Sequence, residues 1–188
     1  MSPLAYVNES TKFIVSGACL AVLLTHPNVP VCWCLSGSVF NSLNSKLLKR
    51  LINESRPEGA TKLDPGMPSS HAQSLAFLST YAALATGASG ALGPWGAAAG
   101  AATVALGVFL AWLRVALGYH TWPQVAVGYG VGVANALLWQ RLGAASVLPA
   151  CATSPGVRAA VWALLWASVA LVLARVGKKA RQVLAKAR

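Results

Sequence analysis

The chain has 188 residues and a formal net charge of +11; 56% of its residues are hydrophobic and only 10% are charged. Soluble domains carry about 25% charged residues, so this composition, with a mean hydropathy of +0.58, excludes an ordinary soluble protein. Residues 72–113 contain no charged side chain, a run long enough for two transmembrane helices of about 20 residues each. We therefore predict an integral membrane protein of the all-α class.

Six apolar segments predict a polytopic bundle of about six transmembrane helices. Backbone groups in lipid have no water to bond, which favours helices, because their backbone hydrogen bonds are internal. Prolines and glycines separate the segments. Their ranges are 11–25, 29–45, 72–91, 96–113, 122–140 and 157–175. Without a repeat or a long polar linker, we expect one membrane-embedded domain over residues 1–188.

The fifth segment contains three glycines at alternate positions, Gly128, Gly130 and Gly132. Small residues allow membrane helices to approach closely. We interpret these glycines as packing residues rather than as members of a site.

The last residues, 176–188, form a predicted basic tail. Together with Arg175 they carry six cations and no acid: Arg175, Lys178, Lys179, Arg181, Lys186 and Arg188. Cations that follow a membrane span favour contact with anionic headgroups on the cytosolic or stromal side. We prefer this interpretation to a nucleic-acid interface, so no nucleic-acid partner is expected.

Ionisable side chains beside the hydrocarbon are rare and usually functional. Here they gather in three stretches, residues 49–57, 68–71 and 114–124. With six spans, the loop between the second and third helices emerges on the same face as the loop between the fourth and fifth. Both termini belong to that face as well. We therefore predict an active site at one membrane face.

The cations of these stretches suit a phosphate. Lys49, Arg56 and Arg114 are donors without acceptors and match an oxyanion. Pro68 and Ser69 predict the start of the third helix, because proline is favoured in a first turn. Free amides at such a helix start bind anions. Ser69 and Ser70 can cap this helix and add hydroxyl donors.

Two histidines, His71 and His120, are the candidate catalytic residues. A neutral imidazole can attack phosphorus while a protonated one donates to the leaving oxygen. The chain has only four carboxylates, and they form no cluster that would hold a metal: Glu9, Glu54, Glu58 and Asp64. A metal-independent phosphatase without a cofactor is the resulting hypothesis.

The three stretches read K-x6-R-P, P-S-x-H and R-x5-H, and they resemble the signature of the type-2 phosphatidic acid phosphatase superfamily. Within it, "DPGMPSSHAQS" and "YHTWPQV" resemble the branch that holds plastid lipid phosphate phosphatase epsilon and dolichyl-diphosphate phosphatase. The resemblance implies that His120 is the nucleophile, forming a phosphohistidine, and that His71 is the acid for the leaving alcohol. It implies the following phosphate ligands: Lys49, Arg56, Ser69, the amide of Ser70, and Arg114.

The chain departs from the superfamily pattern at Leu113, where serine is usual, and at Gln124, where a carboxylate is usual. A carboxylate fixes the tautomer of the nucleophilic imidazole and stabilises the imidazolium formed on attack, whereas an amide does only the first. Gln124 is expected to orient His120.

The substrate implied is phosphatidate, cleaved to diacylglycerol and phosphate. The alternatives are a polyisoprenyl diphosphate such as dolichyl diphosphate, and a catalytically weakened scaffold or lipid-binding subunit. A diphosphate needs more cations than a monophosphate, and beyond the motif residues only Arg50 and Lys62 could supply them. A glycan at Asn53 would obstruct the site on a lumenal face, which favours the plastid envelope membrane over the endoplasmic reticulum. The bilayer and its lipid are the expected partners, and the oligomeric state is not specified.

Overall fold

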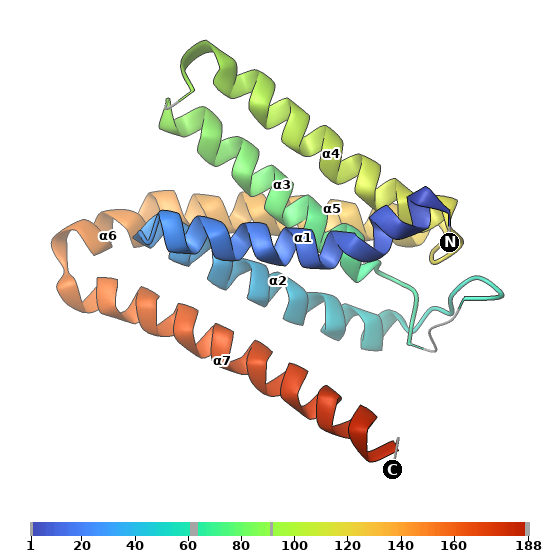
Figure 1. Cartoon of the computed structure of the whole chain (residues 1–188). Coiled ribbons are helices and arrows are strands. Elements are labelled where there is room, and N and C mark those ends of the chain that lie inside the picture. The colour runs from blue at the N-terminus through green and yellow to red at the C-terminus, as the bar shows by residue number, and fades with distance from the viewer. Residues whose placement is uncertain (1, 61–63, 91, 187–188) are drawn as a thin grey trace.

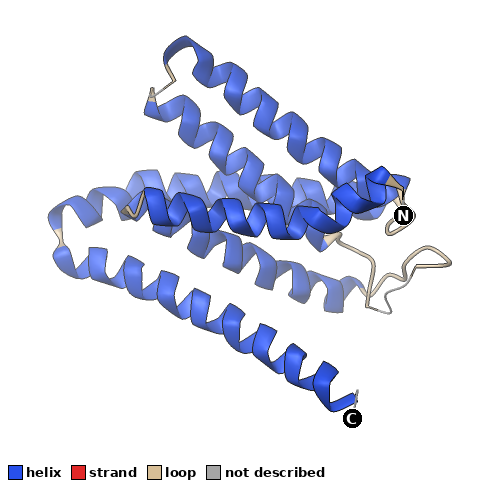
Figure 2. Ribbon diagram, viewed as in Figure 1, coloured by secondary structure: helices blue, strands red, loops and turns tan. Residues whose placement is uncertain are grey.

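The computed structural model describes residues 2–60, 64–90 and 92–186, and every regular element in these ranges is helical. Figures 1 and 2 show a bundle of long helices joined by short loops. The long helices are α1 (Pro3–Thr25), α2 (Val29–Ile52), α3 (Ser70–Ser89), α4 (Gly96–Ala116), α5 (Trp122–Leu142) and α7 (Pro155–Lys186). The short ones are η1 (Gly93–Trp95), η2 (Gly143–Val147) and α6 (Leu148–Thr153). The predictions of an all-α fold and of six long helices are confirmed.

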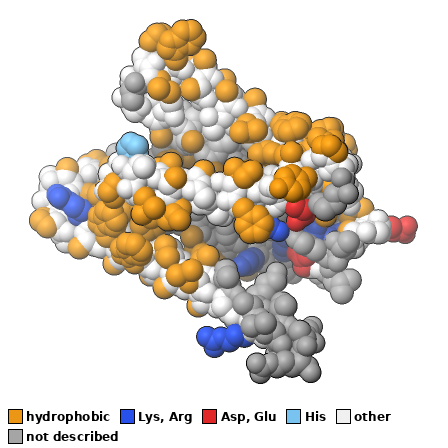
Figure 3. All heavy atoms as spheres, in the orientation of Figure 1, with side chains coloured by type: hydrophobic (Ala, Val, Ile, Leu, Met, Phe, Trp, Pro, Cys, Tyr) orange, Lys and Arg blue, Asp and Glu red, His pale blue; other side chains and the backbone are white. Residues whose placement is uncertain are grey.

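Three stretches are long and apolar enough to cross a membrane: Pro3–Thr25, Gly93–Ala116 and Pro155–Arg175. Apolar side chains are spread in patches over the face drawn in Figure 3, while acidic side chains lie at the end that holds the start of α1. The chain is thus a membrane helical bundle.

Polar side chains of α2, α3 and α5 meet inside the bundle. Gln73 Nε2 of α3 donates to Asn41 Oδ1 at 3.1 Å and to Asn44 Oδ1 at 3.2 Å, both on α2. Asn135 Nδ2 of α5 donates to the same Asn41 oxygen at 2.8 Å. Hydrogen bonds between membrane helices contribute roughly 1 kcal/mol each, so this cluster ties the three helices together.

The starts of the helices follow local capping chemistry. Asn28 caps α2 by accepting the Val31 amide at 3.0 Å, and Pro30 lies in its first turn. The third helix begins later than predicted, because Pro68 precedes the N-cap instead of occupying the first turn. Ser69 is that N-cap, with an extended backbone. Its N–H donates to the Gln124 carbonyl of α5 at 2.9 Å, which holds it outside the helix.

The first and last helices are longer than predicted. The Ser2 side chain accepts from the Ala5 amide, and this cap starts α1 at Pro3. The last helix runs from Pro155 through the basic residues to Lys186. The predicted basic tail therefore continues this helix as far as residue 186, and its last two positions, 187–188, lie outside the described residues.

The helices that carry the three polar stretches end or begin at one end of the bundle. Figure 1 shows the loop after α2, the loop after α4 and both chain ends at this same end. The predicted meeting of these two loops at one end of the bundle is therefore confirmed. The three polar stretches, which are far apart in the sequence, therefore lie close together at this end of the bundle.

Two of the three glycines of α5 allow its close approach to α3. A Cβ on Gly128 would lie 2.7 Å from the Ser69 carbonyl oxygen, and one on Gly132 would overlap the Gln73 carbonyl oxygen. Gly130 has open space around its Cβ position. The packing interpretation is confirmed for Gly128 and Gly132, and the structure adds that Gly128 contacts the backbone of a motif residue.

We expect Gly132→Ala to lower the stability of the detergent-solubilised protein by about 1–3 kcal/mol, the usual effect of overpacking. Gly130→Ala is the matched control, because it adds the same methyl group where there is room. The measurement is the thermal unfolding midpoint of both variants. Equal midpoints would contradict the close contact of α3 and α5.

Candidate active site

A cavity of about 650 Å³ lies where the polar stretches meet. Its lining includes all three predicted cations, both motif histidines and Ser70. These are Lys49, Arg56, Arg114, His71, His120 and Ser70. The cations and imidazoles predicted to converge are therefore brought together. Ser69 and Gln124, each 0% exposed, are buried behind the cavity wall.

Arg56 is the most connected side chain of the cavity. Its Nη1 lies 2.9 Å from His120 Nε2 and donates to the Tyr119 carbonyl oxygen at 3.1 Å. Its Nη2 donates to both carboxylate oxygens of Asp64, at 3.0 and 3.1 Å. One guanidinium thus links the loop after α2 to the loop after α4.

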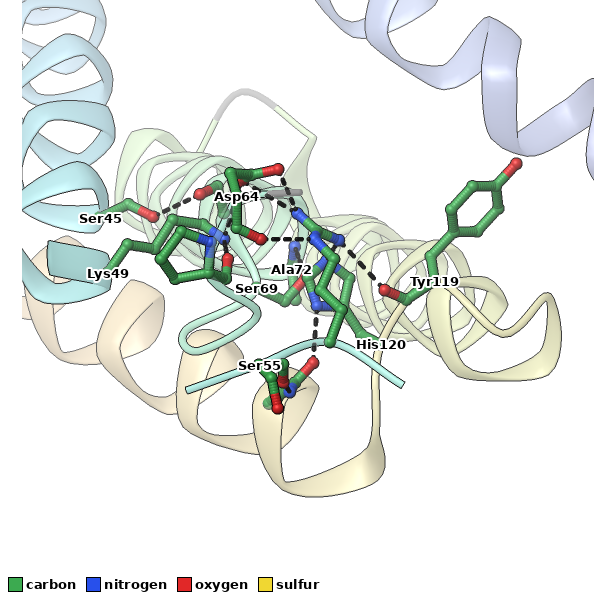
Figure 4. Close-up of polar contacts among 12 residues, drawn as sticks. Ser45, Lys49, Ser55, Asp64, Ser69, Ala72, Tyr119 and His120 are labelled. Atoms are coloured by element: carbon green, nitrogen blue, oxygen red, sulfur yellow. Dashed lines mark hydrogen bonds and ion pairs between the residues drawn. The ribbon is translucent and has the colours of Figure 1, made fainter. Parts of the chain in front are cut away.

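Asp64 stands in the position where the cations would receive an anion. Its Oδ2 also lies 3.3 Å from Lys49 Nζ, and Lys49 Nζ further donates to the Pro65 carbonyl oxygen. Figure 4 shows Asp64 beside Lys49, joined by dashed lines to its partners. Burial alone would raise the pKa of Asp64, but the hydrogen bond and charge of Arg56 outweigh it and lower this pKa. The carboxylate is therefore ionised at neutral pH.

Arg114 is held by the first helix. Its Nη1 donates to Asn8 Oδ1 of α1 at 2.9 Å, and its guanidinium carbon lies 4.2 Å from the centre of the Tyr119 ring. Both contacts leave the positive charge uncompensated, since an amide oxygen and an aromatic face carry no net charge. The Tyr119 hydroxyl in turn donates to Glu9 Oε1 at 3.3 Å.

His120 lies in the loop between α4 and α5 and is 4% exposed. Its Nδ1 is 3.0 Å from Gln124 Oε1, an oxygen that can only accept. Nδ1 therefore carries the proton, and Nε2 presents its lone pair to Arg56 and the cavity. This is the tautomer that a nucleophile at Nε2 requires.

The environment of His120 favours its neutral form. Burial is the main cause that lowers its pKa to about 4, and the Gln124 hydrogen bond opposes this. The charges of Arg56, Arg114 and Lys49 lower the pKa further. A neutral imidazole at pH 7 is the state needed for attack on phosphorus.

Hydrogen bonds to both the oxygen and the nitrogen of the Gln124 side-chain amide fix its orientation. Its Oε1 accepts from His120 and from the Thr121 amide at 3.3 Å. Its Nε2 donates to Glu54 Oε1 at 2.8 Å and to the Ser55 carbonyl oxygen at 2.7 Å. A Cβ on Gly66 would lie 2.5 Å from this Nε2, so the glycine packs directly over the amide. The structure thus places Gln124 Oε1 in contact with His120 Nδ1, while the predicted role of Gln124 in orienting the nucleophile stays a prediction.

The start of α3 contributes Ser69, Ser70 and His71. Ser69 Oγ accepts the Ala72 amide at 3.5 Å as a helix cap, and Ser45 Oγ of α2 donates to Ser70 Oγ at 2.7 Å. His71 is half-buried in the first turn and lines the cavity. The predicted roles of Ser69 and the Ser70 amide as phosphate ligands stay predictions.

Sequence reasoning missed Asn8, Ser45, Glu54 and Asp64 as members of the site. Asn8 and Thr11 are polar residues three apart in an apolar helix, and both are buried. That spacing was a usable signal of a helix face directed inwards. Glu54 lies inside the first motif stretch and Asp64 lies just before the second, but neither spacing reveals which cation or amide each would meet.

We expect His120 to stay neutral at pH 6, because its pKa is lowered to about 4. Unfolding restores an ordinary imidazole that binds a proton near pH 6.5. The free energy of unfolding should therefore decrease as pH falls from 6.5 towards 4. The measurement is a ¹⁵N NMR titration of histidine-labelled protein, with His120→Ala to assign the signal. A midpoint at or above 6.5 would contradict the geometry.

We expect Asp64→Asn to strengthen the binding of inorganic phosphate about two- to fivefold. The substitution removes the carboxylate that competes with phosphate for Lys49 and Arg56, and an exposed ion pair of this kind contributes roughly 0.2–1 kcal/mol. Isothermal titration calorimetry in detergent measures the affinity. Glu58→Gln is the control, since Glu58 is an exposed acid of the same loop. Weaker phosphate binding by Asp64→Asn would mean that Asp64 organises the cations instead of competing for them.

Comparison with known proteins agrees with this site. The model of the PAP2 superfamily matches residues 29–147. Lipid phosphate phosphatase epsilon 2 of Arabidopsis thaliana, a chloroplastic protein, is 35% identical over 164 residues, which cover 87% of this chain and 57% of the relative. Its epsilon 1 counterpart is 37% identical over 72% of this chain and 48% of the relative. Human dolichyldiphosphatase 1 is 30% identical over 72% of this chain and 62% of that protein.

The chain spans about half the length of the two Arabidopsis relatives. No solved structure shows significant similarity to it. The family model covers all three polar stretches that line the cavity, from Lys49 to Gln124. By this match, the chain belongs to the PAP2 superfamily.

Proposed function

We propose that the chain is a metal-independent lipid phosphatase that hydrolyses phosphatidate to diacylglycerol and phosphate. The observation that carries this proposal is the composition of the cavity. Its cationic end continues into walls of aliphatic side chains from four helices: Val15 and Leu20 of α1, Val39 of α2, Leu78 of α3, and Leu165 and Val169 of α7. A cavity with one cationic end and apolar walls fits an amphiphile whose headgroup is a phosphate.

The reaction begins with an exchange of anions. The substrate phosphate displaces the Asp64 carboxylate from Lys49 and Arg56, and Arg56 leaves the lone pair of His120 Nε2. The guanidinium then binds the phosphate oxygens, where its charge stabilises the transition state. Arg114, whose charge is uncompensated by Asn8, is available for the same oxygens.

Phosphoryl transfer follows in two steps. The His120 Nε2 lone pair forms a bond to phosphorus while the bond from phosphorus to the diacylglycerol oxygen breaks, and protonated His71 gives its proton to that oxygen. A water molecule then attacks the phosphohistidine, with neutral His71 accepting a proton from it. The bond between nitrogen and phosphorus breaks, its electrons return to His120, and phosphate leaves.

A polyisoprenyl diphosphate is the second candidate substrate, supported by the similarity to dolichyldiphosphatase. Lys12 of α1 also lines the cavity and is the cation that a second phosphate would meet. It pairs with Glu9 at 3.2 Å, however, which reduces its available charge. Of the two cations considered from the sequence, exposed Arg50 does not line the cavity and Lys62 lies outside the described residues. We therefore favour the monophosphate.

The plastid envelope is the location we propose, because two of the relatives are chloroplastic proteins. The relation to dolichyldiphosphatase keeps the endoplasmic reticulum as the alternative. The substrate enters from the bilayer, since the cavity wall includes α1 and α7, whose apolar side chains are largely exposed at the surface of the bundle.

We expect the purified protein to release phosphate from phosphatidate in the presence of EDTA, and faster than from a polyisoprenyl diphosphate. His120→Ala should lower the rate more than about 1,000-fold, because it removes the nucleophile. His26→Ala is the matched control, since His26 is exposed in the turn between α1 and α2 at the opposite end of the bundle.

The outcomes separate the candidate functions. Preference for the diphosphate would replace phosphatidate as the substrate. Activity retained by His120→Ala would contradict the phosphohistidine route. No release from either lipid would leave the scaffold or lipid-binding role as the remaining function.

A further inference from the structure

The nucleophile of this site lacks a directly bonded carboxylate, because Gln124 occupies the position that faces His120 Nδ1. An amide orients the ring, yet it carries no charge with which to stabilise the imidazolium formed on attack. Three cations lie around the same ring and oppose that charge: Lys49, Arg56 and Arg114. A negative group that acts on His120 is therefore needed for the reaction proposed above.

Such a negative group, the Glu54 carboxylate, lies on the side of Gln124 that faces away from His120. Glu54 Oε1 accepts from Gln124 Nε2 at 2.8 Å, while Gln124 Oε1 accepts from His120 Nδ1 at 3.0 Å. The second Nε2 hydrogen goes to the Ser55 carbonyl oxygen at 2.7 Å, and Oε1 also accepts the Thr121 amide. Rotating the amide by half a turn would set its NH₂ group against the Thr121 N–H and its oxygen against two acceptors, Glu54 Oε1 and the Ser55 carbonyl oxygen. Its orientation is thus determined by its neighbours.

The chain is shaped locally to bring Glu54 to this place. α2 ends at Ile52, and its C-cap residue Asn53 has a left-handed backbone with φ of 48°. The Asn53 amide closes the last turn on the Lys49 carbonyl. The chain therefore reverses directly before Glu54. The Glu54 carbonyl then accepts the Gly66 amide at 2.6 Å, which joins the two arms of the loop.

Among the described residues, the other three carboxylate side chains do not bond the Gln124 amide. Asp64 pairs with Arg56 and Lys49, and substrate must displace it. Glu9 pairs with Lys12 and accepts from Tyr119. Glu58 is exposed in the loop and does not line the cavity. Asp64 reaches the ring through Arg56 on the Nε2 side, whereas Glu54 is joined to Nδ1 through the side-chain amide of Gln124.

We infer that Glu54 is a positioning residue for His120: its carboxylate acts through the Gln124 amide to stabilise the positive charge that the ring gains on phosphorylation. As Nδ1–H becomes more acidic, its bond to Gln124 Oε1 strengthens, and the polarised amide donates more strongly to Glu54. Gln124 and Glu54 together thus stabilise the imidazolium as a directly bonded carboxylate would. This inference rests on the proposed function, because it concerns the same transfer of phosphate to His120.

Glu54→Gln tests the charge separately from the hydrogen bond, because the new amide keeps an oxygen that can accept from Gln124. We expect kcat on phosphatidate to fall about 10- to 100-fold, as is usual when a group acting through another is removed. KM should change little, since within the described residues the Glu54 carboxylate bonds Gln124 and forms no ion pair with Lys49, Arg56 or Arg114. Glu58→Gln is the matched control and should retain the wild-type kcat.

The ¹⁵N titration of His120 gives a readout that does not depend on turnover. Removing a negative charge disfavours the imidazolium, so Glu54→Gln should lower the pKa of His120, by about one unit. The double variant Glu54→Gln/Gln124→Glu moves the carboxylate next to the ring. It should raise that pKa above the wild-type value and recover most of the lost kcat.

Unchanged kcat and unchanged His120 titration in Glu54→Gln would overturn the inference, since the hydrogen bond alone would then be sufficient. A double variant that is as slow as Glu54→Gln and titrates like it would also overturn it. If the wild type released no phosphate from lipid, the proposed function would fail, while the His120 titration would still decide whether Glu54 acts on the ring.

Discussion

Mutual repulsion among three cations at the end of an apolar bundle is the constraint on which the site depends. Lys49 and Arg114 are 7% and 6% exposed, and the Arg56 side chain is 7% exposed. Charges removed from water repel strongly, so each cation needs acceptors. Most of these acceptors are uncharged: the carbonyls of Pro65 and Tyr119, and the amide of Asn8. The cations are thereby held in position while most of their charge remains available to an anion.

The ends of four helices supply the side chains because the glycines of α5 allow α3 to come close. Gly128 contacts the Ser69 backbone, and the Ser69 amide bonds the Gln124 carbonyl. The start of α3, which carries His71, is therefore tied to the start of α5, which follows His120. This contact sets the distance between the two imidazoles. The packing of α3 against α5 therefore also determines the spacing of the two proposed catalytic histidines.

The sequence was sufficient to predict the class of fold, the number of long helices and the meeting of the three motif stretches, because hydropathy and the parity of spans determine them. It was insufficient for Asp64 and Glu54, since their partners depend on how the loop after α2 folds back. Pro68 was misassigned for a related reason: a tertiary hydrogen bond from Ser69 to α5 delays the start of α3. The length of α1 was missed because its polar first half faces the site.

The amide of Gln124, which lies between the proposed nucleophile His120 and the Glu54 carboxylate, has a consequence for the proposed phosphate site. Arg56 bonds His120 Nε2, so a carboxylate directly on the opposite nitrogen would lie close to the cations and compete with substrate for their charge. Gln124 keeps Glu54 on its far side, where the carboxylate bonds the amide and forms no ion pair with Lys49 or Arg56 within the described residues. In the part of the chain that the structure describes, the carboxylate that pairs with those two cations is Asp64, whose side chain is half-exposed and can be displaced. In the proposed mechanism, the carboxylate that stabilises the nucleophile (Glu54) is thus separate from the carboxylate that substrate must displace (Asp64).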